Sequence, residues 1–220
     1  MELLLKEAPH LLLLGILLFV IGYNLKNNYI IIFAAVFTGF ILYFFRNPMI
    51  VNKDIINPNV IFSPCMGKIT SITKKDNIYE ISIYLSPLDV HVQCAPISGY
   101  LKQSNIYKTN NDIEKCTSFF YKNKNKNKNK NKNNNKNNNK NLVRVDQIVS
   151  RFGKGEWLAK VLVKNRINNW ITNGKIKQKQ KYGMIRFGSR VNVYFNENVK
   201  LNVKLNERVN LGETILAFLK

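Results

Sequence analysis

Two short segments of the sequence carry residue types that could do chemistry. The first, residues 183–194, reads GMIRFGSRVNVY and sets a Gly188-Ser189 pair between two strand-like runs. Glycine adopts backbone angles that other residues avoid, and local strain can aim the Ser189 hydroxyl at the Gly188 carbonyl. Attack would replace the amide by an ester, and β-elimination followed by hydrolysis would leave a pyruvoyl group on the new amino terminus. An ordinary Gly-Ser turn is the alternative.

The second segment, residues 81–92, reads ISIYLSPLDVHV. Asp89 and His91 are two residues apart, so on a strand they would face the same side and could form a hydrogen bond. A histidine oriented by a carboxylate is a usable general acid or base near neutral pH. The alternative is an aspartate in a turn after Ser-Pro and an incidental surface histidine. His10 is the only other histidine, so histidine chemistry in the rest of the chain must use His91.

The composition limits the classes of partner and of site. The net charge is +21, and residues 122–140 supply eight lysines, which leaves +13 for the other residues. A surplus of this size favours an anionic partner, either a nucleic acid or a membrane surface. The cysteines Cys65, Cys94 and Cys116 form no CxxC pair and show no zinc-like spacing with histidine. We therefore expect buried thiols in a reducing compartment, and no metal site.

The N-terminal region contains two apolar, uncharged runs, residues 11–23 and 29–45, separated by a polar stretch that includes Lys26. The second run is near the length that a bilayer demands, and the first is shorter. We expect residues 1–48 to form a helical hairpin that spans or dips into the membrane, with both ends in the cytosol. The alternative is a helical pair buried in a soluble core. This is less favoured because a small domain has little interior in which to bury two apolar helices.

From residue 49 onward, short apolar runs rich in Val, Ile, Tyr and Phe alternate with turn residues at a spacing near two. This pattern is typical of strands, and we expect residues 49–220 to form a mainly β (β-rich α+β) domain. Residues 122–140 are almost entirely Lys and Asn and bury no apolar surface, so we expect a disordered insertion between strands. The insertion is either a contact for nucleic acid or anionic lipid, or a neutral low-complexity expansion. The second reading is favoured because no aromatic residues interleave the lysines.

The segments taken together resemble a known family. Six motifs occur in order: FFRNP (44–48), SPCMG (63–67), ISIYLSPLDVHV (81–92), AP-x-x-G (95–99), GMIRFGSRV (183–191) and V-x-x-G-E-T-I-L (209–216). They are similar to those of the short, membrane-anchored form of the phosphatidylserine decarboxylases. The resemblance covers most of the chain outside the Lys/Asn insertion, and GMIRFGSRV and LSPLDVHV are its specific signatures.

The resemblance implies a proenzyme that cleaves itself between Gly188 and Ser189. A large chain (1–188) would stay with a small chain (189–220), and Ser189 would become a covalent pyruvoyl cofactor that acts as an electron sink for the loss of CO₂ from phosphatidylserine. It further implies that His91 is the acid that returns a proton to the carbanion, with Asp89 orienting it. By residue type, Arg186 or Arg190 could hold the substrate carboxylate or phosphate, or could instead lie on a solvated strand face.

The chain departs from the family at supporting positions. Where the family has Ser-Pro-Ala-Asp-Gly, this sequence has Met66 in place of the acid, and Gln93-Cys94 replaces the family's Asn-Arg before Ala-Pro. The family's Asn-Glu-Arg segment and its arginine pair are not recognisable. Ancestry is therefore better supported than activity.

Three functions compete. The first is an active pyruvoyl-dependent decarboxylase that makes phosphatidylethanolamine, associated with a membrane and facing the cytosol. The second is a processing-deficient relative that acts as a lipid-binding or scaffold membrane protein. The third, a basic membrane protein that binds nucleic acid through residues 122–140, ranks last because no recognition motif accompanies the charge. The expected partners are thus a phospholipid substrate and a membrane rather than nucleic acid, and the sequence leaves homo-oligomerisation open.

Overall fold

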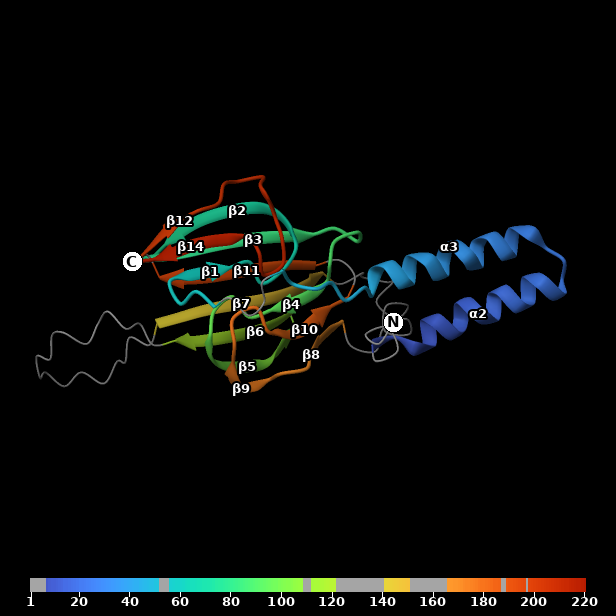
Figure 1. Cartoon of the computed structure of the whole chain (residues 1–220), viewed down its shortest axis with the longest axis horizontal. Coiled ribbons are helices and arrows are strands. Elements are labelled where there is room, and N and C mark those ends of the chain that lie inside the picture. The colour runs from blue at the N-terminus through green and yellow to red at the C-terminus, as the bar shows by residue number, and fades with distance from the viewer. Residues whose placement is uncertain are drawn as a thin grey trace, which may run out of the picture.

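The computed structural model describes residues 7–51, 56–108, 112–121, 141–150, 166–186, 189–196 and 198–220. Within these residues the protein is mainly β, with two helices in its N-terminal region (Figure 1). The prediction of a mainly β protein is therefore confirmed. The predicted disordered insertion, residues 122–140, lies outside the described residues.

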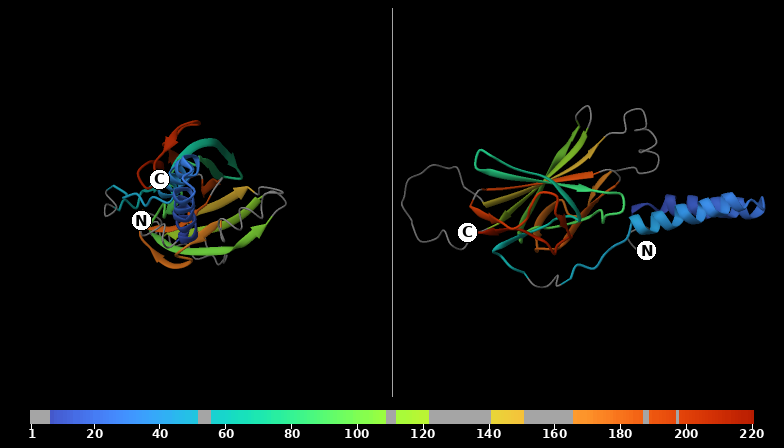
Figure 2. Two further views of the ribbon diagram at one scale, coloured as in Figure 1. Left: turned by 90° about the vertical axis from the view of Figure 1, so that its right-hand side faces the viewer. Right: turned by 90° about the horizontal axis from the view of Figure 1, so that it is seen from above.

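The two apolar runs form α2 (Pro9–Asn24) and α3 (Asn28–Phe44), which lie side by side and project from one end of the β domain (Figures 1 and 2). Asn27 begins α3 as its N-cap, since its side chain accepts hydrogen bonds from the backbone N–H groups of Tyr29 (3.0 Å) and Ile30 (3.3 Å). The helices approach closely at Gly15, where a Cβ atom would lie 2.3 Å from the Thr38 hydroxyl oxygen. A small residue at this position therefore allows the pair to pack.

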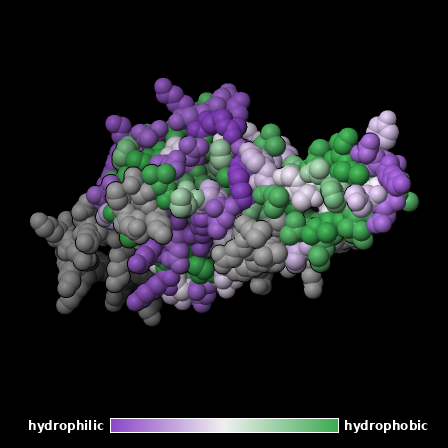
Figure 3. Space-filling model, turned by 45° about the vertical axis from the view of Figure 1, so that its right-hand side comes forward, coloured by the Kyte–Doolittle hydropathy of each residue, from purple (hydrophilic) through white to green (hydrophobic). Residues whose placement is uncertain are grey.

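Apolar side chains cover the part of the hairpin that projects from the domain (Figure 3). They surround both helices rather than one face, as in helices that meet an apolar environment on all sides. The exposed ones include Leu13, Ile16, Leu17, Phe19, Val20, Ile32, Phe33, Val36 and Leu42. Among the described residues, no helix is long and apolar enough to cross a membrane. The spanning role of the hairpin therefore stays a prediction.

Eight antiparallel strands form the largest sheet, in the order β13-β2-β3-β11-β7-β6-β5-β9. In chain order these strands are β2 (Gly67–Lys75), β3 (Ile78–Leu85), β5 (Gly99–Lys108), β6 (Asp112–Tyr121), β7 (Asn141–Ser150), β9 (Asn173–Ile176), β11 (Ser189–Asn196) and β13 (Arg208–Val209).

Two smaller antiparallel sheets have the orders β1-β14-β12 and β4-β10-β8. Their strands are β1 (Val60–Phe62), β4 (Val92–Cys94), β8 (Ile167–Asn169), β10 (Lys181–Ile185), β12 (Val199–Leu201) and β14 (Ile215–Leu219).

All three sheets contribute to the main apolar core. Alternate residues of β11, namely Val191, Val193 and Phe195, are buried in it, which accounts for the spacing of two seen in the sequence. Tyr182 of β10 packs edge-on against Phe119 of β6 with ring centroids 5.5 Å apart, so the β4-β10-β8 sheet is joined to the large one.

A second apolar cluster forms where the hairpin meets the β domain. Buried residues at both ends of the hairpin pack against β4, β10 and the loop before β14. The cluster consists of Ala8, Leu11, Ile41, Phe44, Phe45, Ile50, Val90, Val92, Cys94, Met184 and Leu211. The hairpin is thus packed against β4, which directly follows His91, and against β10, which directly precedes Arg186.

Candidate active site

Two strand pairs bring the chemistry-bearing segments together. β11 pairs with β3 so that Ser189 lies opposite Leu85, the last residue of β3. β10 pairs with β4 so that Met184 lies opposite Val92, the first residue of β4. Residues 86–91 therefore lead from the sheet of β3 to the sheet of β4, and β10 and β11 belong to the same two sheets. The backbone N–H of Ile185 also donates to the carbonyl of His91 (3.0 Å), which ties the end of β10 to this turn.

The predicted scission point lies in the second connection. The backbone of Ser189 pairs with β3 and also with β7, where it lies opposite Val149, so the main chain directly after the junction is held on both sides. Gly188 and the side chain of Ser189 lie outside the described residues. The main chain of Ser189 thus lies beside Leu85, the residue that precedes the turn with His91.

Asp89 and His91 lie in a turn and not on a strand, which corrects the expected alternation. Pro87 follows directly after Ser86 and cannot donate to a ladder, so β3 ends at Leu85. The turn is closed by the backbone N–H of Ser86, which donates to the Asp89 carboxylate (2.8 Å). The same carboxylate pairs with the guanidinium of Arg208. It is therefore occupied by the turn and by β13.

The Asp89 carboxylate was predicted to orient His91. In the structure the main-chain carbonyl of Asp89 does so instead. The Nδ1 atom of His91 lies 2.8 Å from the Asp89 carbonyl oxygen. Because a carbonyl only accepts, Nδ1 carries the proton and Nε2 carries the lone pair of the neutral ring. The ring is fully buried and packs against Phe44 of α3 with centroids 4.3 Å apart. Within the described part of the chain, Nε2 has no hydrogen-bond partner.

The charge state of His91 follows from this burial. Loss of solvation lowers the pKa of His91 from its ordinary value of 6.5 to about 4, although the hydrogen bond and the charge of Asp89 act in the opposite direction and Arg46 adds to the lowering. The ring is therefore neutral at physiological pH, with a buried and unpartnered nitrogen lone pair. Such a nitrogen can act as a general base.

The two candidate substrate-binding arginines differ in their exposure to solvent. Arg190 is exposed, on the face of β11 opposite to the buried Val191. Arg186, directly after β10, is buried and forms an ion pair with Glu7. The sequence did not single out Glu7, because the two partners are 179 residues apart and no local pattern links them.

Met66 is the residue that we predict to replace an acid of the family motif. It is half-buried and lines a small pocket of about 110 Å³ together with Val90, Leu211 and Glu213. The next residue, Gly67, lies so close to β3 that a Cβ atom would sit 2.4 Å from the Tyr84 carbonyl oxygen. The SPCMG segment is thus pressed against the strand that ends at the His91 turn, and the carboxylate that lines this pocket is that of the exposed Glu213.

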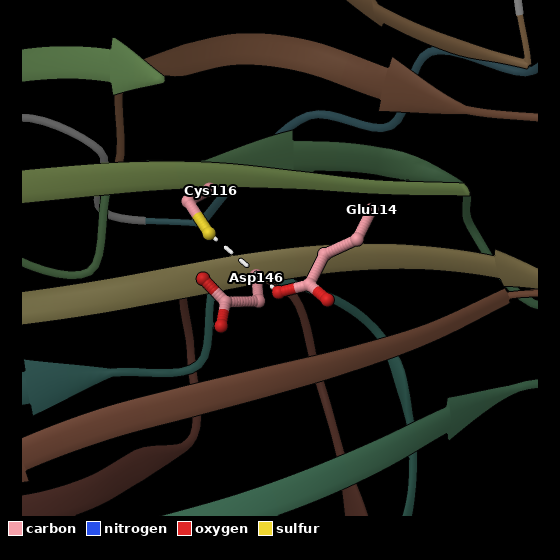
Figure 4. Close-up of side chains that lie close together, drawn as sticks. All are labelled: Glu114, Cys116 and Asp146. Atoms are coloured by element: carbon pink, nitrogen blue, oxygen red, sulfur yellow. Dashed lines mark hydrogen bonds between the residues drawn. The ribbon is translucent and has the colours of Figure 1, made fainter. Parts of the chain in front are cut away.

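A separate cluster of three potential metal ligands lies on β6 and β7 (Figure 4). It consists of Glu114, Cys116 and Asp146. Arg144 donates to both Asp146 oxygens (2.7 and 2.5 Å) and lies 3.6 Å from Glu114. Burial and the neighbouring Asp146 raise the pKa of Glu114. The guanidinium already balances charge here, so we assign the cluster as an ion-pair network of the sheet.

Comparison with known proteins gives one consistent family. A family model described as phosphatidylserine decarboxylase matches residues 37–217. A phosphatidylserine decarboxylase proenzyme of Desulfotalea psychrophila is 32% identical over 187 residues, which cover 81% of this chain and 79% of the relative. The proenzyme of Ehrlichia ruminantium (strain Gardel) is 28% identical over 222 residues, 98% of this chain and 90% of the relative. That of Syntrophotalea carbinolica is 31% identical over 190 residues, 83% and 81% of the two chains. No solved structure matches.

The low pKa of His91 has a measurable consequence for stability. The folded-state pKa of about 4 lies below the ordinary value of 6.5, so the unfolded chain takes up a proton first as the pH falls. The stabilising contribution is complete above pH 6.5 and is lost as the pH falls towards 4. Denaturant titrations of a Ser189→Ala chain over this range should therefore show a falling free energy of unfolding. Adding His91→Gln should reduce the total fall in the free energy of unfolding by on the order of 2 kcal/mol. An equal fall with and without His91→Gln would contradict this account.

Proposed function

Because the chain belongs to the phosphatidylserine decarboxylase family, we propose that it cuts its own Gly188-Ser189 bond and decarboxylates phosphatidylserine to phosphatidylethanolamine. The observation that carries the proposal is the strand register, in which the main chain of Ser189 pairs with Leu85, the residue before the turn that holds the buried, neutral His91. Relatives named as proenzymes support a chain that is processed before it acts.

In the scission step, Nε2 of His91 takes the proton of the Ser189 hydroxyl as its oxygen attacks the Gly188 carbonyl carbon. The C–N bond breaks, and the proton passes to the departing nitrogen, which leaves an ester. The His91 ring, neutral again, then takes the Cα proton of Ser189 as the Gly188 carboxylate leaves. Water adds to the imine form of the resulting enamine, and ammonia departs. The main chain after Ser189 is paired with β3 and β7, so the new amino terminus stays in place through these steps.

The residues present fit a pyruvoyl group, because the group would be made from Ser189 itself and the turn after Leu85 supplies a buried proton acceptor. When formed, it supplies a carbonyl that withdraws electrons from the substrate as CO₂ leaves. His91 suits the return of a proton to the substrate carbon. Its lowered pKa of about 4 makes the protonated ring more acidic than an ordinary imidazolium, so a proton taken up in one step is readily given back in the next.

The exposed apolar surface of α2 and α3 supports membrane association. A side chain such as Leu17 or Phe33 is more than half exposed on the hairpin and would gain free energy by entering lipid. We place the hairpin in the lipid, the β domain at the cytosolic surface and the substrate head group near the hairpin base. Because Phe44 of α3 packs on His91, this arrangement puts the catalytic turn next to the lipid that it acts on.

One observation favours a second function. Met66 replaces the acid that the family uses to assist processing, and no carboxylate has taken its place in the buried part of the pocket that it lines. A chain without this acid could keep the fold and the apolar hairpin yet remain uncut. It would then act as a lipid-binding or scaffold protein.

The decarboxylase proposal makes Ser189 indispensable. The unaltered protein should convert phosphatidylserine in vesicles to phosphatidylethanolamine, measured by mass spectrometry of the lipids, and Ser189→Ala should abolish the conversion. Ser71→Ala, a half-buried serine of β2, is the matched control and should retain it. Conversion by Ser189→Ala would rule out a cofactor made from this residue.

The second function is separated from the first by restoring the acid. Met66→Asp places a carboxylate in the pocket beside Val90, which precedes His91. If the missing acid limits processing, scission of freshly translated Met66→Asp should be faster than that of the parent by about a hundredfold or more, the size of one general-base contribution. Met66→Asn, of the same shape without charge, is the control. Equal rates for the parent and both variants would show that this position does not limit processing.

Membrane association should depend on the hairpin. In flotation with phosphatidylcholine–phosphatidylglycerol vesicles at 1 M salt, where charge attraction is screened, the parent should float. Leu13→Asn with Val36→Asn should weaken binding at least tenfold, because each apolar side chain contributes about 1.5–3 kcal/mol when buried. The control variant Met49→Asn with Leu205→Asn replaces two exposed apolar residues outside α2 and α3 and should leave binding unchanged. Equal flotation of the two double variants would contradict insertion of the hairpin.

A further inference from the structure

A buried carboxylate ties the start of the hairpin to the strand that leads to the scission point. One Glu7 oxygen accepts from Trp170 Nε1 (2.6 Å), the other accepts from the guanidinium of Arg186, and the Asn168 side-chain amide donates to both (3.1 and 3.0 Å). The Glu7 carboxylate is fully buried and the Arg186 side chain is only 6% exposed. Three donors, from β8, from the residue after it and from the residue after β10, thus converge on Glu7 at the start of the hairpin region, two residues before α2.

Glu7 is held in its charged form. Burial acts to raise the pKa of Glu7, but the hydrogen bonds from Asn168, Arg186 and Trp170 and the charge of Arg186 outweigh it, so the pKa is lowered. A charge-assisted contact of this kind is strong only while both partners are present. Removing one leaves the other as an uncompensated buried charge.

The contact acts on the chain next to the bond to be cut. The backbone N–H of Arg186 donates to the carbonyl of Arg166 (2.8 Å), and Arg186 is followed after only two residues by Ser189. Arg186 is therefore held through its main chain by the residue before β8 and through its side chain by Glu7. On the other side of the junction, the main chain from Ser189 is held by β3 and β7. Both ends of the short connection are fixed, and Glu7 fixes the first of them.

We propose that Glu7 is a positioning residue for self-scission, which sets the end of β10 so that the Gly188 carbonyl meets the Ser189 hydroxyl. The inference rests on the proposed function. It also assigns the Arg186 guanidinium to the contact with Glu7 rather than to a substrate anion. The hairpin thereby contributes to the geometry of the cut through its first residues, in addition to its apolar surface.

The test compares scission rates of the full chain after translation in vitro. Glu7→Gln keeps an oxygen for Trp170 and Asn168 but turns an uncharged amide towards Arg186. We expect the first-order rate to fall roughly tenfold to a hundredfold, the effect of a displacement on the order of 1 Å at a reacting centre. The matched control is Asp76→Asn, an exposed carboxylate in the turn between β2 and β3, and its rate should equal that of the parent. An unchanged rate in Glu7→Gln would overturn the proposal.

A second variant separates positioning from folding. Glu7→Gln combined with Arg186→Met removes both charges, and such replacement of a buried ion pair is near neutral for stability. The positioning role predicts a melting temperature close to that of the parent but a slow cut. A double variant that regains both stability and the parental rate would show that the contact only supports the fold.

The result is readable even if the parent does not cut itself. In a Ser189→Ala background, hydrogen exchange of the peptide covering residues 181–190 reports the same positioning without scission. Glu7→Gln should speed exchange of the Arg186 amide, and Asp76→Asn should not. An uncut parent with this exchange response would reject the proposed function and keep the positioning contact. An exchange rate that does not respond to Glu7→Gln would reject the contact itself.

Discussion

The candidate site depends on two antiparallel strand pairs, β3 with β11 and β4 with β10, which lie in different sheets and are linked by the same turn. The turn with Asp89 and His91 therefore begins beside the main chain of Ser189 and ends beside Met184. Main-chain hydrogen bonds carry this arrangement, and a slip of one residue in either ladder would reverse the face of every side chain. Side-chain replacements such as that at Met66 disturb it far less. This difference explains how supporting residues can change while the strand pairing stays the same.

The apolar hairpin is part of the site as well as a candidate lipid anchor. Phe44 covers the His91 ring, and the cluster at the hairpin base packs against β4 and β10. The resulting loss of solvation is the main cause of the low pKa of His91. At the other end of the hairpin, Glu7 holds the residue that follows β10. The same helices therefore bury the proposed base and fix the chain that the base acts on.

The sequence predicted most of the β domain because its signals are local. Runs such as residues 79–85 and 190–195 alternate with a spacing of two and became β3 and β11, and the position of the junction stays a prediction from the family motifs. The orientation of Asp89 could not be predicted, because spacing on a strand was applied to residues that Pro87 turns out of the strand. The pair of Glu7 and Arg186 could not be predicted either, since its partners come from opposite ends of the chain and meet only after three sheets and the hairpin have packed. Strand alternation outward from Val191 would have placed Arg190 on the exposed face.

The central claim is that the Gly188-Ser189 peptide bond breaks without another molecule, with His91 as the base. The most direct measurement is intact-mass spectrometry of the freshly translated, unaltered chain, followed over time at two protein concentrations. The account predicts two products, residues 1–188 and residues 189–220, the smaller lacking its amino-terminal amine, formed at a rate independent of concentration. A single undivided species of 25.5 kDa at all times, or a rate that rises with protein concentration, would contradict it.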